Sequence, residues 1–361
     1  MFRRKRRQNL PSSSNSEEDL TDIIREHALP FLPAKSLLRF MTVCHHWKRH
    51  IITPSFHLNQ SLRFTDITGL FCQATPESPP VFIPIHPTSA GVPDPSLSFL
   101  PEPVVIKASS NGLLCCQGRN EDKLYYLCNP AIKHWRKLPK PTASLGSEPA
   151  LVVIFEPSEF PNISQYKIIC PFEFAGFDGA IGFEIYSSKK NSWNVSGDFC
   201  FGAENATLGS GVHVNGVVYW PVKTGGILSF DLTKDRSELL DNGNSEGKDC
   251  ILGTYYGRLC KVYIEFDGDE LVVKVMDNIQ LPQRVKMWET VNCAGYPFDT
   301  DMPLDDIASR VVAIGREEAV VKCWNKLYSY DFERMETKIL SKPGESHYNI
   351  CVPYVNNLVY L

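Results

Sequence analysis

The feature that most constrains this chain is a repeated pattern of a β-rich apolar run, a polar turn and a second β-rich run. The pattern occurs five times, at residues 124–139, 183–197, 227–240, 271–283 and 327–340. Its turn residues are 58, 44, 46 and 54 positions apart: Asn129, Ser187, Asp231, Asp277 and Asp331. A period of about 45–50 residues that holds several strands is typical of a β-propeller blade. The repeat therefore predicts a propeller, and a large sandwich of unrelated hairpins is the alternative.

Short turn signals in front of apolar runs support the same interpretation. The pairs Asn111-Gly112 and Asn215-Gly216 favour two-residue primed turns, whose twist matches that of the flanking strands. Related signals occur at Gly257, at Asn325 and at Asn356-Asn357. Because the last of these lies just before the end of the sequence, the final blade needs its later strands from the N-terminal side, near residues 62–106. We expect six blades, with the ring closed by an N-terminal strand.

The charge distribution argues against nucleic acid as a partner, and the lengths of the apolar runs argue against a membrane. The 361 residues carry a formal charge of -4, but residues 1–60 hold ten Lys/Arg against five acids, whereas residues 61–361 hold 27 against 36. A large acidic body binds phosphates poorly. No apolar run approaches the roughly 20 residues that cross a bilayer.

The 12 cysteines do not indicate a disulfide framework. The N-terminus has a basic run, Arg3 to Arg7, and no apolar segment typical of a secretory signal. We therefore expect buried thiols in an intracellular protein of the cytoplasm or nucleus. The basic run is either a nuclear import signal or a solvated terminus.

Four regions follow from these patterns. Residues 1–16 have no periodicity and are expected to be a disordered tail. Residues 17–60 show helical spacing of apolar residues in three short helices, which together are too small to bury a core of their own. Residues 61–103 form a connection that supplies possible closing strands and has nine prolines between 75 and 103. Residues 104–361 form the β domain.

The helical region resembles the F-box, which docks a receptor onto the Skp-type adaptor of cullin-based SCF ubiquitin ligases. The resemblance is carried by residues 32–56, LPAKSLLRFMTVCHHWKRHIITPSF, and eleven family positions match in order: Leu32, Pro33, Lys35, Ser36, Leu37, Leu38, Arg39, Phe40, Val43, Cys44 and Trp47. It implies an adaptor-binding set of Leu32, Pro33, Leu37, Leu38, Val43, Cys44, Trp47 and Ile51. Phe40 and Met41 are expected to face the interior.

The C-terminal region is similar to the F-box-associated, kelch-like domain of plant F-box proteins. The matching pieces include SSNGLLCC (109–116), LCNPAIKHWRKLP (127–139) and GVHVNGVVYW (211–220). Together the two resemblances cover residues 17 to 340. They imply a small all-α F-box module followed by an all-β kelch-like propeller.

No motif indicates catalysis, a cofactor or a metal. Cys44, His45, His46 and His50 are crowded, but no second ligand pair follows at a finger-like spacing. Cys115-Cys116 is adjacent rather than Cys-x-x-Cys, so it is a poor chelate and a poor redox pair.

The sequence thus predicts a non-catalytic substrate receptor: the F-box binds the adaptor and through it a cullin, and the propeller recruits an unknown target protein. The longest non-repeating interval, residues 283–302, supplies a candidate target-binding set of Trp288, Tyr296 and Phe298. The alternatives are a kelch-like enzyme or sugar-binding propeller, and an F-box scaffold that does not lead to degradation.

Overall fold

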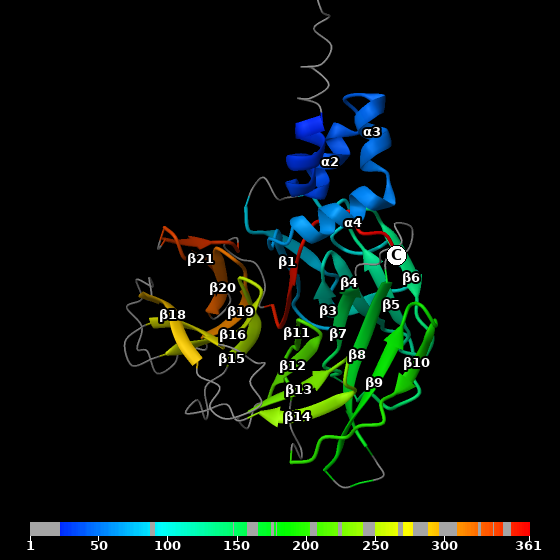
Figure 1. Cartoon of the computed structure of the whole chain (residues 1–361), viewed down its shortest axis with the longest axis vertical. Helices are drawn as coiled ribbons and strands as arrows, with labels where there is room; N and C mark the ends of the chain where they lie inside the picture. The colour runs from blue at the N-terminus through cyan, green and yellow to red at the C-terminus, as the bar shows by residue number, and fades with distance from the viewer. Residues whose placement is uncertain are drawn as a thin grey trace, which may run out of the picture.

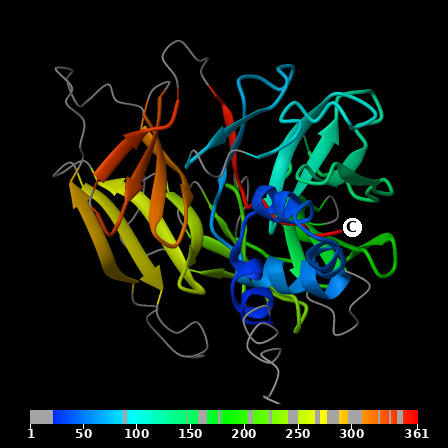
Figure 2. The same ribbon diagram turned by 90° about the horizontal axis from the view of Figure 1, so that it is seen from above.

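A small helical module lies above a ring of β-sheets in the computed structural model (Figures 1 and 2). The structure describes residues 22–86, 91–146, 148–156, 165–174, 177, 179–202, 208–222, 226–240, 250–265, 270–276, 288–295, 309–323, 326–334, 336–341 and 348–361. The predicted disordered tail, residues 1–16, lies outside the described residues.

The helical module begins with a helical segment at residues 22–27. It continues with η1 (Leu29–Phe31), α2 (Ala34–Phe40), α3 (His45–Ile51) and α4 (Pro54–Arg63). Thr53 caps α4, because its side chain accepts a hydrogen bond from the backbone N–H of Phe56, and Pro54 suits the first helical position. Helix α4 is a further helix beyond the three expected in residues 17–60, because Pro54 begins it, and it ends at Arg63, past the predicted boundary at residue 60. Among the described residues no helix is long and apolar enough to cross a bilayer.

Five antiparallel sheets of four strands follow one another along the chain. They are β3 (Val104–Ser110), β4 (Leu113–Gly118), β5 (Tyr125–Asn129) and β6 (His134–Lys137); β7 (Val152–Glu156), β8 (Gln165–Glu173), β9 (Ile181–Ser187) and β10 (Ser192–Val195); β11 (Val212–Val214), β12 (Val217–Pro221), β13 (Ile227–Asp231) and β14 (Arg236–Leu240); β15 (Cys250–Tyr255), β16 (Arg258–Glu265), β17 (Glu270–Met276) and β18 (Trp288–Gly295); β19 (Ser309–Ile314), β20 (Glu318–Cys323), β21 (Lys326–Asp331) and β22 (Glu336–Ile339). Four of the five predicted repeats coincide with the third and fourth strands of one sheet, whereas the repeat at 271–283 contains only the third strand, β17, because the fourth strand, β18, begins at Trp288. The predicted β-propeller architecture is confirmed.

A three-stranded sheet joins the two ends of this array. It contains β2 (Val81–Pro84), β1 (Gly69–Gln73) and the last strand, β23 (Ile350–Tyr354), in that order. The expected pairing of an N-terminal strand with the C-terminal end is therefore present, in a register that places Phe71 opposite Val352. The first strand of each four-stranded sheet contacts that of the next, and β23 contacts both β19 and β3.

The primed turns predicted from the sequence are present at three strand connections. At Asn111-Gly112, φ is 45° and 80°, and at Asn215-Gly216 it is 50° and 83°. At Tyr256-Gly257 the values are 49° and 74°. Positive φ at both central residues defines the type I′ turn, whose twist matches a hairpin.

The signal at Asn356-Asn357 does not make a hairpin turn. Strand β23 ends at Tyr354, and no strand follows in residues 355–361. The Asn357 side chain donates from Nδ2 to Asn111 Oδ1 (2.9 Å) and accepts from the Val359 backbone N–H (3.2 Å). The asparagine therefore holds the tail against the β3–β4 turn, because its amide nitrogen donates to that turn while its amide oxygen accepts from the tail itself.

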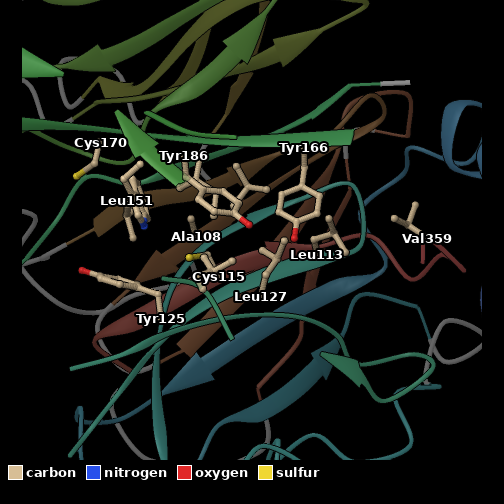
Figure 3. Packing of buried hydrophobic residues seen from close by; sticks show 14 residues of the cluster. Ala108, Leu113, Cys115, Tyr125, Leu127, Leu151, Tyr166, Cys170, Tyr186 and Val359 are labelled. Carbon is tan, nitrogen blue, oxygen red and sulfur yellow. The ribbon is translucent and has the colours of Figure 1, made fainter. Parts of the chain in front are cut away.

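The core lies between successive sheets. One cluster joins β3–β6 to β7–β10 and includes Cys115, Tyr166 and Tyr186, with Val359 of the tail at its edge (Figure 3). Cys116, the neighbour of Cys115, belongs to a different cluster on the other face of its sheet. Burial raises the pKa of the Cys115 thiol well above its usual range. The cysteines whose side chains the structure describes form no disulfide with one another.

We predict that Gly112→Ala destabilises the protein far more than Gly257→Ala. Both glycines have positive φ, which costs an alanine roughly 1 kcal/mol. A Cβ on Gly112 would lie 1.9 Å from Asn357 Oδ1, whereas a Cβ on Gly257 would meet no heavy atom within 4 Å. Thermal unfolding of both variants at one scan rate measures the difference, and equal losses would contradict the tail contact.

Candidate functional site

The helical module is joined to the propeller by a shared apolar core. Helix α4 lies against the sheets, while α2 and α3 project away from them (Figure 1). We define the junction core as the buried side chains that come together here from the module, the β5–β6 turn and the tail: Leu29, Ala34, Leu37, Ile51, Phe56, Ala131 and Leu358. Because Ala131 and Leu358 come from the propeller side, the module does not bury its core alone.

Gln60 of α4 is the polar link across this junction. Its fully buried side chain donates from Nε2 to the Leu32 carbonyl (3.0 Å) and accepts at Oε1 from the Leu358 backbone N–H (3.0 Å). The backbone N–H of Ala34 also donates to the Asn356 carbonyl (2.9 Å). These bonds tie the start of α2 and the end of α4 to the C-terminal tail.

Asn129 holds the tail on the propeller. Its Nδ2 donates to the carbonyls of Asn357 (3.1 Å) and Val359 (2.8 Å). Its Oδ1 accepts from the Ala131 backbone N–H (2.9 Å) and from the Tyr354 hydroxyl (3.1 Å). The sequence marked Asn129 only as a turn residue, because three of its four partners are more than 200 positions away.

The predicted adaptor-binding residues occupy three different environments. Leu37 and Ile51 are fully buried in the junction core, with 0% exposure. Leu32, Pro33, Leu38 and Trp47 are half-buried, as are Phe40 and Met41, which were expected inside. Val43, at 63% exposure, and Cys44 are open to solvent. The structure thus separates residues that support the module from residues that a partner can reach.

The module also exposes apolar residues that the sequence did not single out. Phe31 and Ile52 are each about half exposed, at 51% and 50%. Helix α3 adds four exposed polar side chains: His45, His46, Lys48 and Arg49. The sequence predicted Ile51, rather than Ile52, as an adaptor-binding residue. Helical periodicity identifies one apolar face of a helix but does not say which neighbour covers that face.

The cysteine and histidines of α3 take part in contacts within the module. Cys44 caps α3, since its Sγ accepts from the Trp47 backbone N–H (3.4 Å), and Trp47 packs edge-on against Phe40 at 5.2 Å. His50 packs on Phe56 at 5.0 Å, and burial lowers its pKa, with Arg25 adding to the effect. No group of three or more His, Cys, Asp or Glu side chains within the described ranges is placed to hold a metal ion.

A second exposed surface lies on the β7–β10 sheet. We define the Phe cluster as Phe174, Phe177, Phe199 and Phe201. The Phe174 ring lies 4.4 Å from Phe199 and 6.0 Å from Phe177, and Phe177 lies 6.3 Å from Phe201. Phe177 is 56% exposed and Phe201 is 61% exposed. The sequence did not reveal this cluster, because β9 and β10 separate its two pairs along the chain.

The structure does not describe the side chains of the three aromatic residues that we predicted to bind a target. Trp288 is the first residue of β18, and the description of that strand covers its backbone only. Tyr296 and Phe298 lie outside the described residues.

Comparison with known families settles the identity of both regions. The F-box domain family matches residues 18–59, and the F-box associated beta propeller domain family matches residues 95–360, about three quarters of the chain. The chain is an F-box protein of the F-box associated β-propeller family. The family expected from the sequence is therefore confirmed.

Several Arabidopsis thaliana proteins are similar to this F-box protein. "F-box protein At5g49610" is 27% identical over 209 residues, which cover 52% of this chain and 54% of that protein. "F-box protein At5g07610" is 27% identical over 330 residues, covering 85% and 76%. "F-box/kelch-repeat protein At3g23880" is 23% identical over 267 residues, covering 66% and 72%. The match thus spans about half the length of the first relative and about three quarters of the other two.

We predict that Gln60→Leu weakens the junction. The change leaves the Leu32 carbonyl and the Leu358 N–H without their partners. Each unpaired buried group costs roughly 1–3 kcal/mol, so we expect a loss of about 2–4 kcal/mol in the free energy of unfolding. Denaturant unfolding measures it, with exposed Leu62→Ala as the control. A loss no larger than that of the control would contradict the bridging role of Gln60.

Proposed function

We propose that this F-box protein is the substrate receptor of an SCF-type cullin ubiquitin ligase. The module docks onto a Skp-type adaptor, and the propeller recruits a target protein that a separate enzyme ubiquitinates. The chain itself contributes proximity, which raises the effective concentration of target lysines near that enzyme. The observation that carries the proposal is a module whose inner side is buried by its own propeller while its outer side exposes apolar residues.

The adaptor surface that we propose is centred on Val43 and Cys44. Half-buried Leu32, Pro33, Leu38 and Trp47 contribute edges that a partner can cover. Leu37 and Ile51 act from the junction core, by keeping α2 and α3 in place. The exposed basic residues of α3 favour an acidic rim on the adaptor, because opposite charges around an apolar centre speed and orient docking.

The propeller offers a separate face for a target. The module contacts the β5–β6 turn, and the tail contacts the β3–β4 turn, so both connections lie on the module side. In an antiparallel sheet the connection between the second and third strands lies at the opposite end. The Phe cluster follows β8 and β10, the second and fourth strands of their sheet, and therefore belongs to the face away from the module. This placement supports the Phe cluster as a target-binding surface, and Trp288, Tyr296 and Phe298 remain a second proposed set.

We also propose that the β2–β1–β23 sheet is the sixth blade of the propeller. Its support is the contact of β23 with the first strands on both sides, β19 and β3. We further propose an intracellular location, and its support is the match to the F-box domain family, whose partners in ubiquitin ligases lie inside the cell.

We predict that Val43→Glu in the full chain lowers affinity for the Skp-type adaptor at least about 100-fold, because it places a charge in an apolar contact. Affinity is measured by titration with purified adaptor. Val195→Glu, at a 43% exposed position on β10, is the matched control and should bind normally. A truncation at residue 60 is unsuitable, since it cuts α4 and removes Ala131 and Leu358 from the junction core. Unchanged binding by Val43→Glu would exclude this adaptor surface.

We predict that Phe177→Ser together with Phe201→Ser reduces target capture and leaves adaptor affinity unchanged. Both rings are more than half exposed, so the change should cost little stability. Proteins captured with the full chain are compared with those captured by the variant. The control is Ile339→Ser, at a 56% exposed position on β22. If the double variant retains every captured protein, the target surface lies elsewhere.

The two alternatives have separate tests. A scaffold without degradation binds adaptor and target, but target abundance does not change when the proteasome is inhibited. A kelch-like enzyme requires a stoichiometric metal or other catalytic group, which metal analysis of the purified protein detects.

A further inference from the structure

Two cysteines face each other where the propeller closes. The register of β1 and β23 places Cys72 directly opposite Cys351. Directly opposed residues of antiparallel strands have Cα atoms about 4.5 or 5.5 Å apart, and both values lie in the range that a disulfide spans. Both thiols also pack against one apolar cluster with Leu70 and Ala313, so their side chains lie on the same face of the sheet.

The neighbouring sheet carries two basic residues whose charges act on Cys351. Arg310 and Lys322 are opposite each other on β19 and β20. Arg310 donates to the Asn349 carbonyl (2.9 Å), and Lys322 donates to the Tyr348 carbonyl. Cys351 Sγ itself lies 4.0 Å from the Tyr348 carbonyl oxygen. The positive charges of Arg310 and Lys322 both favour a thiolate at Cys351.

The pKa of Cys351 follows this arrangement. A hydrogen bond from Cys72 lowers it, and Arg310 and Lys322 lower it further, against the opposing effect of burial. Cys351 is also partly exposed, whereas Cys72 is fully buried. A small disulfide from solution therefore reaches Cys351 before Cys72. Cys72 is then placed to attack the mixed disulfide formed at Cys351.

A second pair of neighbouring cysteines, Cys116 and Cys128, allows a comparison of thiol pKa within the same fold. Cys116 and Cys128 lie on adjacent strands and are hydrogen-bonded, but both are fully buried. The hydrogen bond with Cys128 and burial raise the pKa of Cys116 well above its usual range. Close approach alone therefore does not make a reactive pair in this fold.

We propose that Cys72 and Cys351 form a reversible disulfide by exchange with glutathione disulfide, and that this bond covalently closes the propeller. The Cys351 thiolate attacks one sulfur of glutathione disulfide, whose S–S bond breaks to release a glutathione thiolate. Cys72, giving up its proton, then attacks Cys351 Sγ and displaces the second glutathione. Two protein thiols are oxidised, and one glutathione disulfide is reduced to two glutathione molecules.

The bond would join residues about 280 positions apart, across the pairing that holds the ring together. A cross-link over so long a loop restricts the unfolded chain strongly. We expect the oxidised protein to unfold about 5 °C higher than the reduced protein.

The test uses the full chain equilibrated with glutathione disulfide, then alkylated and mapped by peptide mass spectrometry. We expect a Cys72–Cys351 peptide that reducing agent removes, with Cys116 and Cys128 alkylated as thiols only after unfolding. Cys351→Ser should abolish the peptide and the rise in unfolding temperature, and Cys250→Ser, at a partly exposed position on β15, should change neither.

The wild-type map alone decides the proposal even if a variant fails to fold. A glutathione adduct that persists on Cys351, a different cysteine pair, or two unmodified thiols at Cys72 and Cys351 would each overturn it. Adaptor binding is not a readout here, so the result is independent of the proposed ligase function.

Discussion

The pairing of β1 with β23 is the interaction on which the rest of the structure depends. It joins Gly69–Gln73 to Ile350–Tyr354, segments from opposite ends of the sequence. Closing so long a loop has an entropic cost, which the buried apolar surfaces of β1 and its neighbouring sheets offset. Helix α4 immediately precedes β1, and the tail immediately follows β23. The same pairing therefore brings the helical module and the C-terminal tail to one side of the propeller.

The tail converts ring closure into a fixed attachment of the module. Asn129 binds it to the propeller, and Gln60 binds it to α4, so two buried side chains connect three parts of the chain. A buried polar group that loses its partner is costly, which makes such a network specific as well as stabilising. In the receptor function that we propose, a defined direction between the adaptor surface and the target surface determines where a target is held.

The sequence predicted the fold, whereas the burial of the candidate site residues follows only from the tertiary structure. The repeats around Asn129, Ser187 and Asp231 correspond to strand pairs of successive sheets, and the Asn-Gly pairs form the expected turns. These features are local, so they can be read from neighbouring residues. Asn356-Asn357 carries the same local signal, yet it anchors a tail, because its partners are Asn111 and Asn129. The Phe cluster was missed for a similar reason, since its members meet only after β9 and β10 have folded between them.

By itself the sequence determined the family, the order of a helical module and a propeller, and the need for an N-terminal strand to complete the ring. The family followed from the resemblance of residues 32–56 and of the later β segments to known F-box proteins. Periodicity and turn chemistry, which act over a few residues, were sufficient for the order of the two regions. Only the tertiary structure decided that Leu37 and Ile51 lie inside the junction while Val43 lies outside, and that Cys72 faces Cys351. Burial and pairing across the ring depend on contacts between residues distant in sequence, and no local pattern records them.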